Sequence, residues 1–192
     1  MSRLVLGSTS RYRADLLRRL LPDFEQRAPG TDETLRPGEV PREGALRLAI
    51  AKAAGAGHGL TDALVIGSDQ LAELHGRALG KPGSIESAHT QLAACAGREV
   101  QFHTALCLLD TRDGRQRTHV DTTRVRFRAL SSAEIARYVE REQPLDCAGS
   151  FKCEGLGIAL FDAIESVDPT ALIGLPLIAL ARLLREAGLA IP

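Results

Sequence analysis

Short apolar runs alternate with amphipathic stretches along this chain, and the alternation is typical of an α/β protein. Runs of mostly apolar residues bounded by glycine or polar residues are expected to form strands. They occur at 3–6, 64–67, 100–109, 119–127 and 157–161. The third and fourth runs are predicted to pair antiparallel around a turn at Asp113-Gly114, and the whole pattern predicts an α/β fold with a mixed sheet and flanking helices.

Helices are expected where apolar residues recur three and four positions apart behind a capping residue. These segments run over 11–21, 41–54 and 84–96, from 131 onward, and over 175–187. Two of them carry a cation on the face that should turn inward. Arg13 shares its face with Leu16 and Leu17, and Lys52 extends a stripe that contains Leu48. Solvation alone would not place a charge on these faces, so both cations are candidate functional residues.

The length of 192 residues and the mass of 20.6 kDa fit a single domain over 1–192, or one domain divided into two lobes by a cleft. Basic and acidic residues number 24 each. This balance argues against a nucleic acid polymer or a membrane as the partner, because both attract a basic surplus. No apolar run reaches the roughly 20 residues of a membrane span. Four cysteines without a C-x-x-C pair favour reduced thiols and a cytoplasmic location.

Lysine is rare in this chain, and its positions are informative. Only three of the 24 basic residues are lysines, namely Lys52, Lys81 and Lys152, and the rest are arginines. An ammonium group is a compact charge with three donors, which can enter a tight phosphate site. The three lysines together therefore favour a site for phosphate groups, although any one of them could stand there by chance.

Two segments that follow predicted strands offer polar groups at the end where open α/β sheets bind ligands. Gly7-Ser8-Thr9-Ser10 leads into a helix, whose N-terminal amides together with Arg13 could hold a phosphate. Asp69 follows the apolar run at 64–67 and is expected at the end of that strand, as a base or a magnesium ligand. Asp32-Glu33 supplies further carboxylates in a polar loop.

A glycine-rich segment at 147–157 contains Lys152 and Glu154, two residues apart. In an extended stretch, residues two apart lie on the same side. Lys152 would then face a phosphate, and Glu154 would face a donor edge such as that of guanine.

The motifs occur in a characteristic order. They are Ser8-Thr9-Ser10 with Arg13, Thr31-Asp32-Glu33, Lys52, Gly67-Ser68-Asp69-Gln70, Gly80-Lys81-Pro82, the segment 148–155 and Ile173-Gly174-Leu175-Pro176. In this order they resemble the Maf-like family of nucleoside triphosphate pyrophosphatases. The resemblance implies a fold similar to inosine triphosphate pyrophosphatase, with a long sheet and a cleft between two lobes. It also implies cleavage between the α and β phosphates, which releases a nucleoside monophosphate and diphosphate.

Within that family, the segment Gly149-Ser150-Phe151-Lys152-Cys153-Glu154-Gly155 resembles the branch that hydrolyses 7-methyl-GTP. The branch acting on dTTP and UTP typically has Asp-Thr where this chain has Asp69-Gln70. The resemblance implies that Tyr12, Gln70 and Glu154 select the base, with Tyr12 standing where an enterobacterial relative is expected to have Trp. Guanine methylated at N7 is cationic, so an aromatic ring and a carboxylate suit it.

The resemblance also implies roles for the other polar residues. Asp69 is expected to accept a proton from the attacking water, to bind a divalent metal cation (Mg²⁺ or Mn²⁺), or to do both. Glu33 is expected to help bind that metal. Lys52 and Lys81 are expected to be catalytic through their charge on the triphosphate. The remaining residues expected to bind substrate are Ser8, Ser10, Arg13 and Lys152.

Other functions stay open at this point. One is a pyrophosphatase acting on dTTP and UTP or on a broad range of nucleotides. Another is a nucleotide-sensing regulator of septum formation, which the family's association with inhibited septation suggests. Retention of both carboxylates and all three lysines favours an enzyme whose partner is a small-molecule nucleoside triphosphate. Assembly into a homodimer is also left open.

Overall fold

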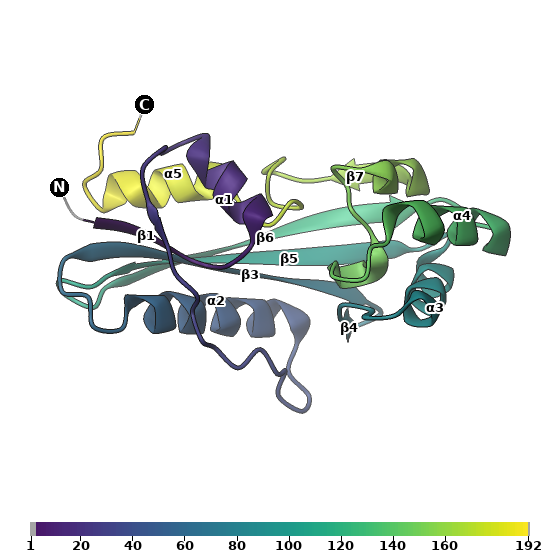
Figure 1. Cartoon of the computed structure of the whole chain (residues 1–192), viewed down its shortest axis with the longest axis horizontal. Coiled ribbons are helices and arrows are strands. Elements are labelled where there is room, and N and C mark those ends of the chain that lie inside the picture. Colours follow the sequence, from purple (N-terminus) through teal and green to yellow (C-terminus); the bar gives the residue numbers. More distant parts are fainter. Residues whose placement is uncertain (1–2, 192) are drawn as a thin grey trace.

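The computed structural model describes residues 3–191, which form a mixed seven-stranded sheet with helices on both faces (Figure 1). The strands are β1 (Arg3–Gly7), β2 (Glu25–Gln26), β3 (Ala63–Leu74), β4 (Arg77–Leu79), β5 (Glu99–Asp110), β6 (Gln116–Phe127) and β7 (Phe161–Glu165). The α-helices are α1 (Arg11–Arg18), α2 (Pro41–Gly57), α3 (Ile85–Cys95), α4 (Ser132–Glu142) and α5 (Leu177–Glu186). Two 3₁₀ helices are η1 (Ala148–Ser150) and η2 (Leu156–Leu160).

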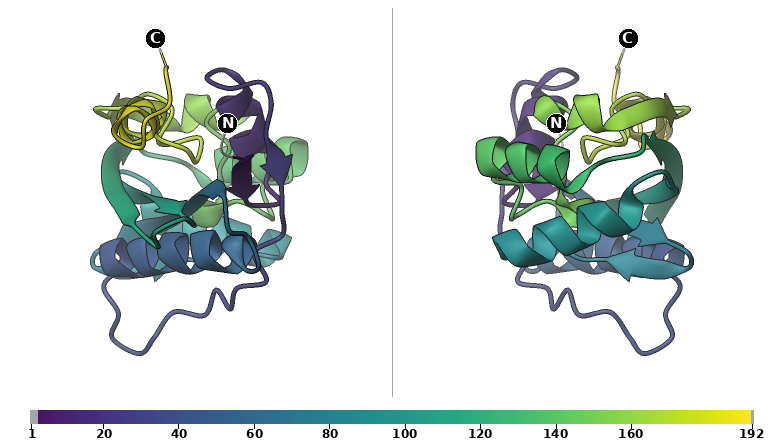
Figure 2. Two further views of the ribbon diagram at one scale, coloured as in Figure 1. Left: turned by 90° about the vertical axis from the view of Figure 1, so that its left-hand side faces the viewer. Right: turned by 90° about the vertical axis from the view of Figure 1, so that its right-hand side faces the viewer.

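The sheet order is β2-β1-β3-β5-β6-β7, with β4 paired to β3. β1 pairs parallel with β2 and β3, and the remaining pairs are antiparallel, so the predicted mixed sheet is confirmed. The long strands β3, β5 and β6 run the length of the molecule, with α2 on one face and α1 and α5 on the other (Figure 1). Viewed from the two ends, the loop before α2 projects beyond that helix (Figure 2).

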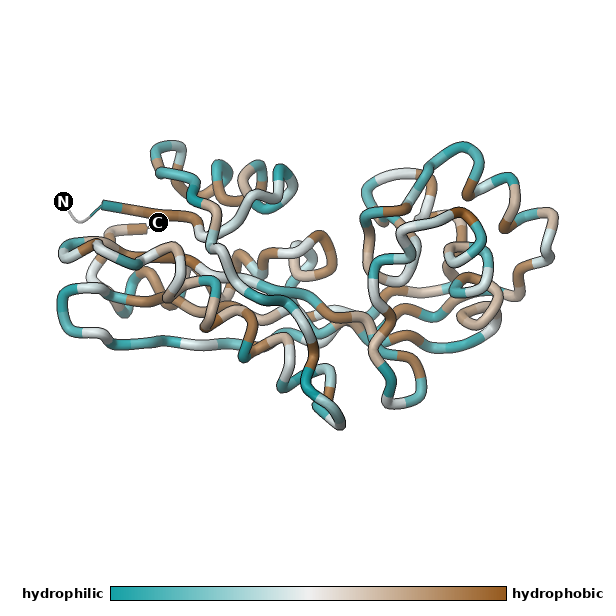
Figure 3. Tube along the Cα trace, turned by 60° about the horizontal axis from the view of Figure 1, so that its bottom comes forward, coloured by the Kyte–Doolittle hydropathy of each residue, from teal (hydrophilic) through white to brown (hydrophobic). Residues whose placement is uncertain are grey.

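Two hydrophobic cores lie on the same face of the long strands. The side chains of the even-numbered residues of β3 point to this face, because successive residues of a strand alternate between its two faces. Leu64 and Ile66 pack with α1 and α5 in one core, whereas Ala72 and Leu74 pack with α3 and α4 in the other. The two lobes built on these cores are joined by the strands (Figure 3). Between the cores, on the same face, β3 carries the polar pair Ser68 and Gln70.

A pair of glycines lets α2 approach the opposite face closely. Gly7 of β1 lies beside Gly67 of β3 in the strand register. A Cβ atom added at Gly67 would lie 2.2 Å from the carbonyl oxygen of Ala49, and one added at Gly7 would lie 2.8 Å from the carbonyl oxygen of Lys52. No side chain fits between these strands and the backbone of α2. The close approach holds Lys52 against the strands.

Several local predictions are confirmed. The hairpin between β5 and β6 turns around Asp113-Gly114, and its register pairs Leu109 with Gln116. Ser131 and Glu134 form the predicted capping box at the start of α4. Within residues 3–191, no helix is long and apolar enough to cross a membrane.

Several boundaries were predicted wrongly. The helix expected at 41–54 continues to Gly57, and the strand expected at 119–127 starts at Gln116. The strand expected at 64–67 continues as β3 to Leu74, so Asp69 lies in its middle, because the alternation resumes after the polar break. The strand expected at 157–161 is instead the 3₁₀ helix η2, and β7 starts only at Phe161. Helix α1 ends at Arg18, earlier than the expected residue 21.

We expect Gly67→Ala to lower the free energy of unfolding by about 3 kcal/mol, because the added methyl group would overlap the backbone of α2. Gly80→Ala is the matched control, since nothing lies within 4 Å of a Cβ added there, and it should change stability by less than about 0.5 kcal/mol. Chemical denaturation followed by circular dichroism measures both. Equal effects of the two substitutions would contradict the close approach.

Candidate active site

A cleft of about 790 Å³ lies between the two lobes and collects most of the polar residues singled out in the sequence. The predicted site residues among those that line it are Ser8, Ser10, Tyr12, Arg13, Glu33, Lys52, Asp69, Gln70, Lys81 and Glu154. Lys152 is not among the lining residues.

Asp69 reaches the cleft from mid-strand because β1 ends at Gly7, which is paired with Gly67, and β4 begins to pair only at Ala72. That edge of β3 is therefore open beside Asp69.

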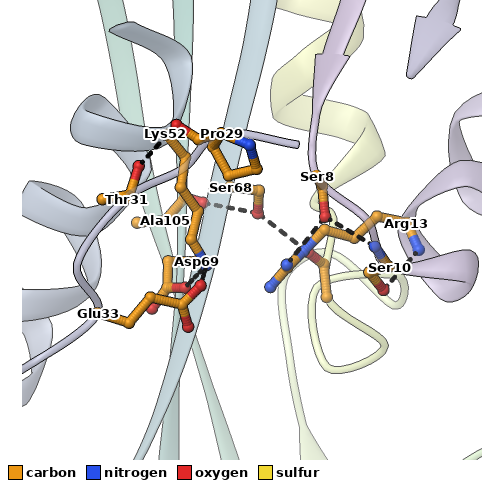
Figure 4. A network of polar contacts seen from close by, with 11 residues as sticks. Ser8, Ser10, Arg13, Pro29, Thr31, Glu33, Lys52, Ser68, Asp69 and Ala105 are labelled. Atoms are coloured by element: carbon orange, nitrogen blue, oxygen red, sulfur yellow. Dashed lines mark hydrogen bonds and ion pairs between the residues drawn. The ribbon is translucent and has the colours of Figure 1, made fainter. Parts of the chain in front are cut away.

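The ammonium group of Lys52 lies between two carboxylates (Figure 4). Its Nζ atom is 2.6 Å from Oδ1 of Asp69 and 2.8 Å from Oε1 of Glu33. Lys52 and Asp69 are each only 5% exposed, whereas Glu33 lies in an exposed loop. A buried charge needs a partner of opposite sign, so Lys52 and Asp69 depend on one another.

The loop that carries Glu33 is tied to α2 by a second ion pair. Arg47 donates from Nε and Nη2 to the two oxygens of Glu39, at 2.5 and 2.6 Å. The same Nη2 atom donates to the carbonyl of Thr34, next to Glu33. This fork ties the loop to α2, the helix that carries Lys52.

The two carboxylates respond differently to their surroundings. Burial raises the pKa of Asp69 above its usual range, and the charge and hydrogen bond of Lys52 offset that effect only in part. Partial burial also raises the pKa of Glu33, but the hydrogen bond and charge of Lys52 outweigh it, so the pKa of Glu33 is lowered. Asp69 is therefore protonated more readily than an exposed aspartate, and Glu33 less readily than an exposed glutamate.

Arg13 is fixed on the other side of the cleft by α1. Ser10 caps that helix and accepts a hydrogen bond from the Arg13 amide at 3.4 Å. The Arg13 side chain donates from Nε to the carbonyl of Gly174 at 2.9 Å and from Nη1 to Oγ of Ser8 at 3.4 Å. Burial lowers the pKa of the Arg13 guanidinium, while the negative charges of Asp69 and Glu33 raise it. The inward-facing cation predicted from the sequence is therefore aimed at the same cleft as Lys52.

The cleft is also lined by an aromatic ring and a further carboxylate. Tyr12 is 39% exposed on α1. Glu154 is exposed on the opposite lobe, where its Oε2 accepts a hydrogen bond from the thiol of Cys153 at 3.2 Å. Gln70 lines the same cleft, and its amide nitrogen donates to the carbonyls of Ala171 and Leu172 at 3.1 and 3.0 Å. The amide oxygen of Gln70 is not used in these contacts.

Lys152 and Glu154 are not arranged as predicted. Residues 153–155 form a turn that leads into η2, so the expected extended alternation is absent there. The ammonium of Lys152 donates to the carbonyl of Glu142 at 3.4 Å and lies 3.9 Å from Oδ1 of Asp146. Of the three lysines, Lys52 and Lys81 line the cleft, whereas Lys152 contacts Glu142 and Asp146.

Oxygen ligands for a hard divalent cation are present. Glu33 and Asp69 each use one carboxylate oxygen for Lys52, which leaves their second oxygens outside those contacts. Within residues 3–191, no group of three histidine, cysteine or acidic residues could hold a metal ion alone. Magnesium is commonly bound by one or two carboxylates plus phosphate oxygens of the substrate. The two residues fit that mode.

Sequence reasoning missed the segment 171–174 as a part of the wall. Leu172, Ile173 and Gly174 line the cleft, and their backbone contacts β3 and α1. The signal that could have found this contact is the polar pair Ser68 and Gln70, which interrupts an otherwise apolar face of β3.

Comparisons with known proteins show the family to which the chain belongs. The family described as Maf-like protein matches residues 3–187. A 7-methyl-GTP pyrophosphatase of Xanthomonas axonopodis pv. citri is 58% identical over 192 residues, covering all of both chains. Another, of Burkholderia thailandensis, is 55% identical and covers 98% of this chain and 89% of that relative. Among solved structures, the Staphylococcus aureus Ham1 protein has a TM-score of 0.46 and 21% identity, covering 65% of this chain and 71% of its own.

We expect Lys52→Met to destabilise the fold by about 3–5 kcal/mol at pH 7, because it leaves the Asp69 carboxylate buried without a cation. Loss of Lys52 raises the pKa of Asp69 further, so the stability deficit should shrink as the pH falls and Asp69 becomes protonated. The double variant Lys52→Met/Asp69→Asn should recover most of the loss. Urea denaturation at pH 7 and pH 5 tests this, and a Lys52→Met protein as stable as the wild type at both pH values would contradict it.

Proposed function

The chain belongs to the Maf-like family, and from this premise we propose that it hydrolyses 7-methyl-GTP to 7-methyl-GMP and diphosphate. The observation that carries the proposal is the arrangement of the cleft. Cations and carboxylates gather around Lys52, and the same cleft is lined by an aromatic ring and a further carboxylate, Tyr12 and Glu154. The substrate joins an anionic triphosphate to a cationic base, so the triphosphate end of the proposed site is at Lys52 and the base end is at Tyr12 and Glu154. The names of the full-length relatives support the same activity.

The base end suits a cationic purine. The exposed ring of Tyr12 can stack on the methylated guanine, whose positive charge strengthens contact with an aromatic face. Glu154 can accept hydrogen bonds from N1–H and the amino group of the base while its charge attracts the ring. Gln70 has its amide nitrogen held by the backbone of 171–172, so its oxygen would be the atom presented to the base.

The triphosphate end would be bound by Arg13, Lys52 and Lys81, with the hydroxyls of Ser8 and Ser10 beside them. Charge that develops on the phosphate oxygens in the transition state would be stabilised by these preorganised cations. Lys152 would join them only if its ammonium exchanged the Glu142 carbonyl for a phosphate oxygen.

In the proposed reaction, Asp69 accepts the proton of the attacking water. Its pKa is raised by burial, which makes it a stronger base than an exposed aspartate. A divalent cation, Mg²⁺ or Mn²⁺, would neutralise phosphate charge when bound. Asp69 and Glu33 would hold it through the carboxylate oxygens that Lys52 does not use.

We expect Asp69→Asn to lower kcat by roughly 10²- to 10⁴-fold, because the amide keeps the shape of the side chain but cannot accept the proton. Asp110→Asn is the control for loss of a buried aspartate, since Asp110 pairs with Arg112 outside the cleft. Diphosphate release from 7-methyl-GTP with excess magnesium is measured for each. An Asp69→Asn enzyme with near-normal turnover would remove Asp69 from the proton transfer.

We expect Glu154→Gln to lower kcat/KM for 7-methyl-GTP more than for GTP or UTP, because only the methylated base is cationic. Loss of a charged hydrogen bond costs about 1.5 to 3 kcal/mol, or roughly 10- to 150-fold. Tyr12→Ala should shift the preference in the same direction by about 1 to 2 kcal/mol. Steady-state kinetics with the three triphosphates measures both variants.

The control for these two variants is Glu140→Gln, which removes an exposed carboxylate of α4 outside the cleft. It should leave kcat/KM unchanged for all three triphosphates. Equal proportional losses on the three triphosphates in Glu154→Gln would mean that Glu154 supports the cleft without selecting the base. A wild-type enzyme that prefers UTP would contradict the proposed substrate itself.

A further inference from the structure

The polar break between the two cores holds a segment from the far end of the chain. Ser68 and Gln70 of β3 and Thr104 of β5 face the connection between β7 and α5. Thr104 and Gln70 donate to the carbonyl of Ala171 at 2.9 and 3.1 Å. Ser68 lies within 3.0 Å of the carbonyl of Gly174. The connection is therefore held along its backbone where it lines the cleft.

The carbonyl of Gly174 is within hydrogen-bond distance of two donors that are far apart in the sequence. The hydroxyl of Ser68 is 3.0 Å from it, and Nε of Arg13 is 2.9 Å from it (Figure 4). Arg13 is thus anchored through the inner nitrogen of its guanidinium. The two terminal nitrogens remain for Ser8 and for a ligand in the cleft.

The backbone conformation at position 174 requires glycine. Its φ is +128°, a value that side chains rarely tolerate, and a Cβ atom there would lie 3.5 Å from Nε and 3.7 Å from Cγ of Arg13. Glycine thus lets the carbonyl and the Arg13 side chain approach in one orientation.

Ser68 has no solvent exposure, and its neighbours on the same face of β3 include Ile66, which is also fully buried. An apolar residue would continue that core at lower cost, because a buried hydroxyl must find a hydrogen-bond partner. The single hydroxyl proton can be donated to the Ala105 carbonyl at 2.8 Å or to the Gly174 carbonyl. The hydrogen bond to Gly174 joins the middle of β3, one residue before Asp69, to the carbonyl that also accepts from Arg13.

We propose that Ser68 is a positioning residue that fixes the Arg13 guanidinium relative to Asp69 through the carbonyl of Gly174. Asp69 follows Ser68 on a rigid strand. This contact therefore fixes the position of the phosphate-binding cation relative to the proton acceptor. The kinetic consequence of this role rests on the proposed function. The contact itself can be observed without any substrate.

A double-mutant cycle tests the kinetic consequence. Ser68→Ala should lower kcat for 7-methyl-GTP by roughly 10- to 100-fold, as expected for a misplaced catalytic-site cation, with a smaller change in KM. In an Arg13→Lys background, which lacks the Nε donor, the same substitution should change kcat by less than about 2-fold. Thr123→Val removes a buried hydroxyl that contacts Ser166 in the same connection, and its effect should be equal in both backgrounds. Ser68→Cys replaces Ser68→Ala in the cycle if the alanine variant does not fold.

The contact is also tested by the Arg13 Nε–H signal in a ¹H–¹⁵N spectrum of the free protein, identified by its absence in Arg13→Lys. Ser68→Ala should shift this signal and speed its exchange with solvent, whereas Thr123→Val should do neither. Equal losses of kcat in the two Arg13 backgrounds, or an unmoved Arg13 signal, would overturn the positioning role. A wild-type protein without turnover would instead refute the proposed function, and the spectrum would still decide whether Ser68 positions Arg13.

Discussion

The site depends on a buried ammonium group that must be paired. Lys52 lies on the inner face of α2, and only the carboxylates of Asp69 and Glu33 neutralise it among the described residues. Its distance to Asp69 requires the backbone of α2 to lie almost against the sheet, which the facing glycines at positions 7 and 67 permit. The pairing with Glu33 requires the loop before α2 to cross the helix, and the Arg47–Glu39 fork holds it there. The packing of one helix thus determines where three charges of the cleft meet.

The second constraint is that two cores share one set of strands. Since β3 and β5 extend through both lobes, the space between the cores is bounded by rigid backbone. Polar residues at this point of β3 cannot be covered by either core, so they bind the connection that returns to α5. The cleft is consequently lined by residues from both ends of the chain, with α1 and the connection on one side and the 146–154 segment on the other.

The sequence predicts the fold class and much of the site because those features depend on local patterns. Apolar periodicity placed Arg13 and Lys52 on inward faces, and the structure confirms that both lie at the cleft. The positions of Asp69 within β3 and of Glu154 in a turn were missed for a physical reason. Whether a strand continues past a polar break, or a glycine-rich segment turns, is decided by tertiary contacts such as those of Gln70 with Leu172. The displacement of Lys152 toward Glu142 likewise depends on how α4 packs.

The central claim is that this cleft directs hydrolysis to the bond between the α and β phosphates of 7-methyl-GTP. It is tested most directly by identifying the products of the purified chain with magnesium, using ion-exchange chromatography of the nucleotide and ³¹P NMR of the released phosphate. The account predicts 7-methyl-GMP and diphosphate in equal amounts from the first turnovers, with no 7-methyl-GDP. Release of 7-methyl-GDP and orthophosphate, or no consumption of 7-methyl-GTP, would contradict it.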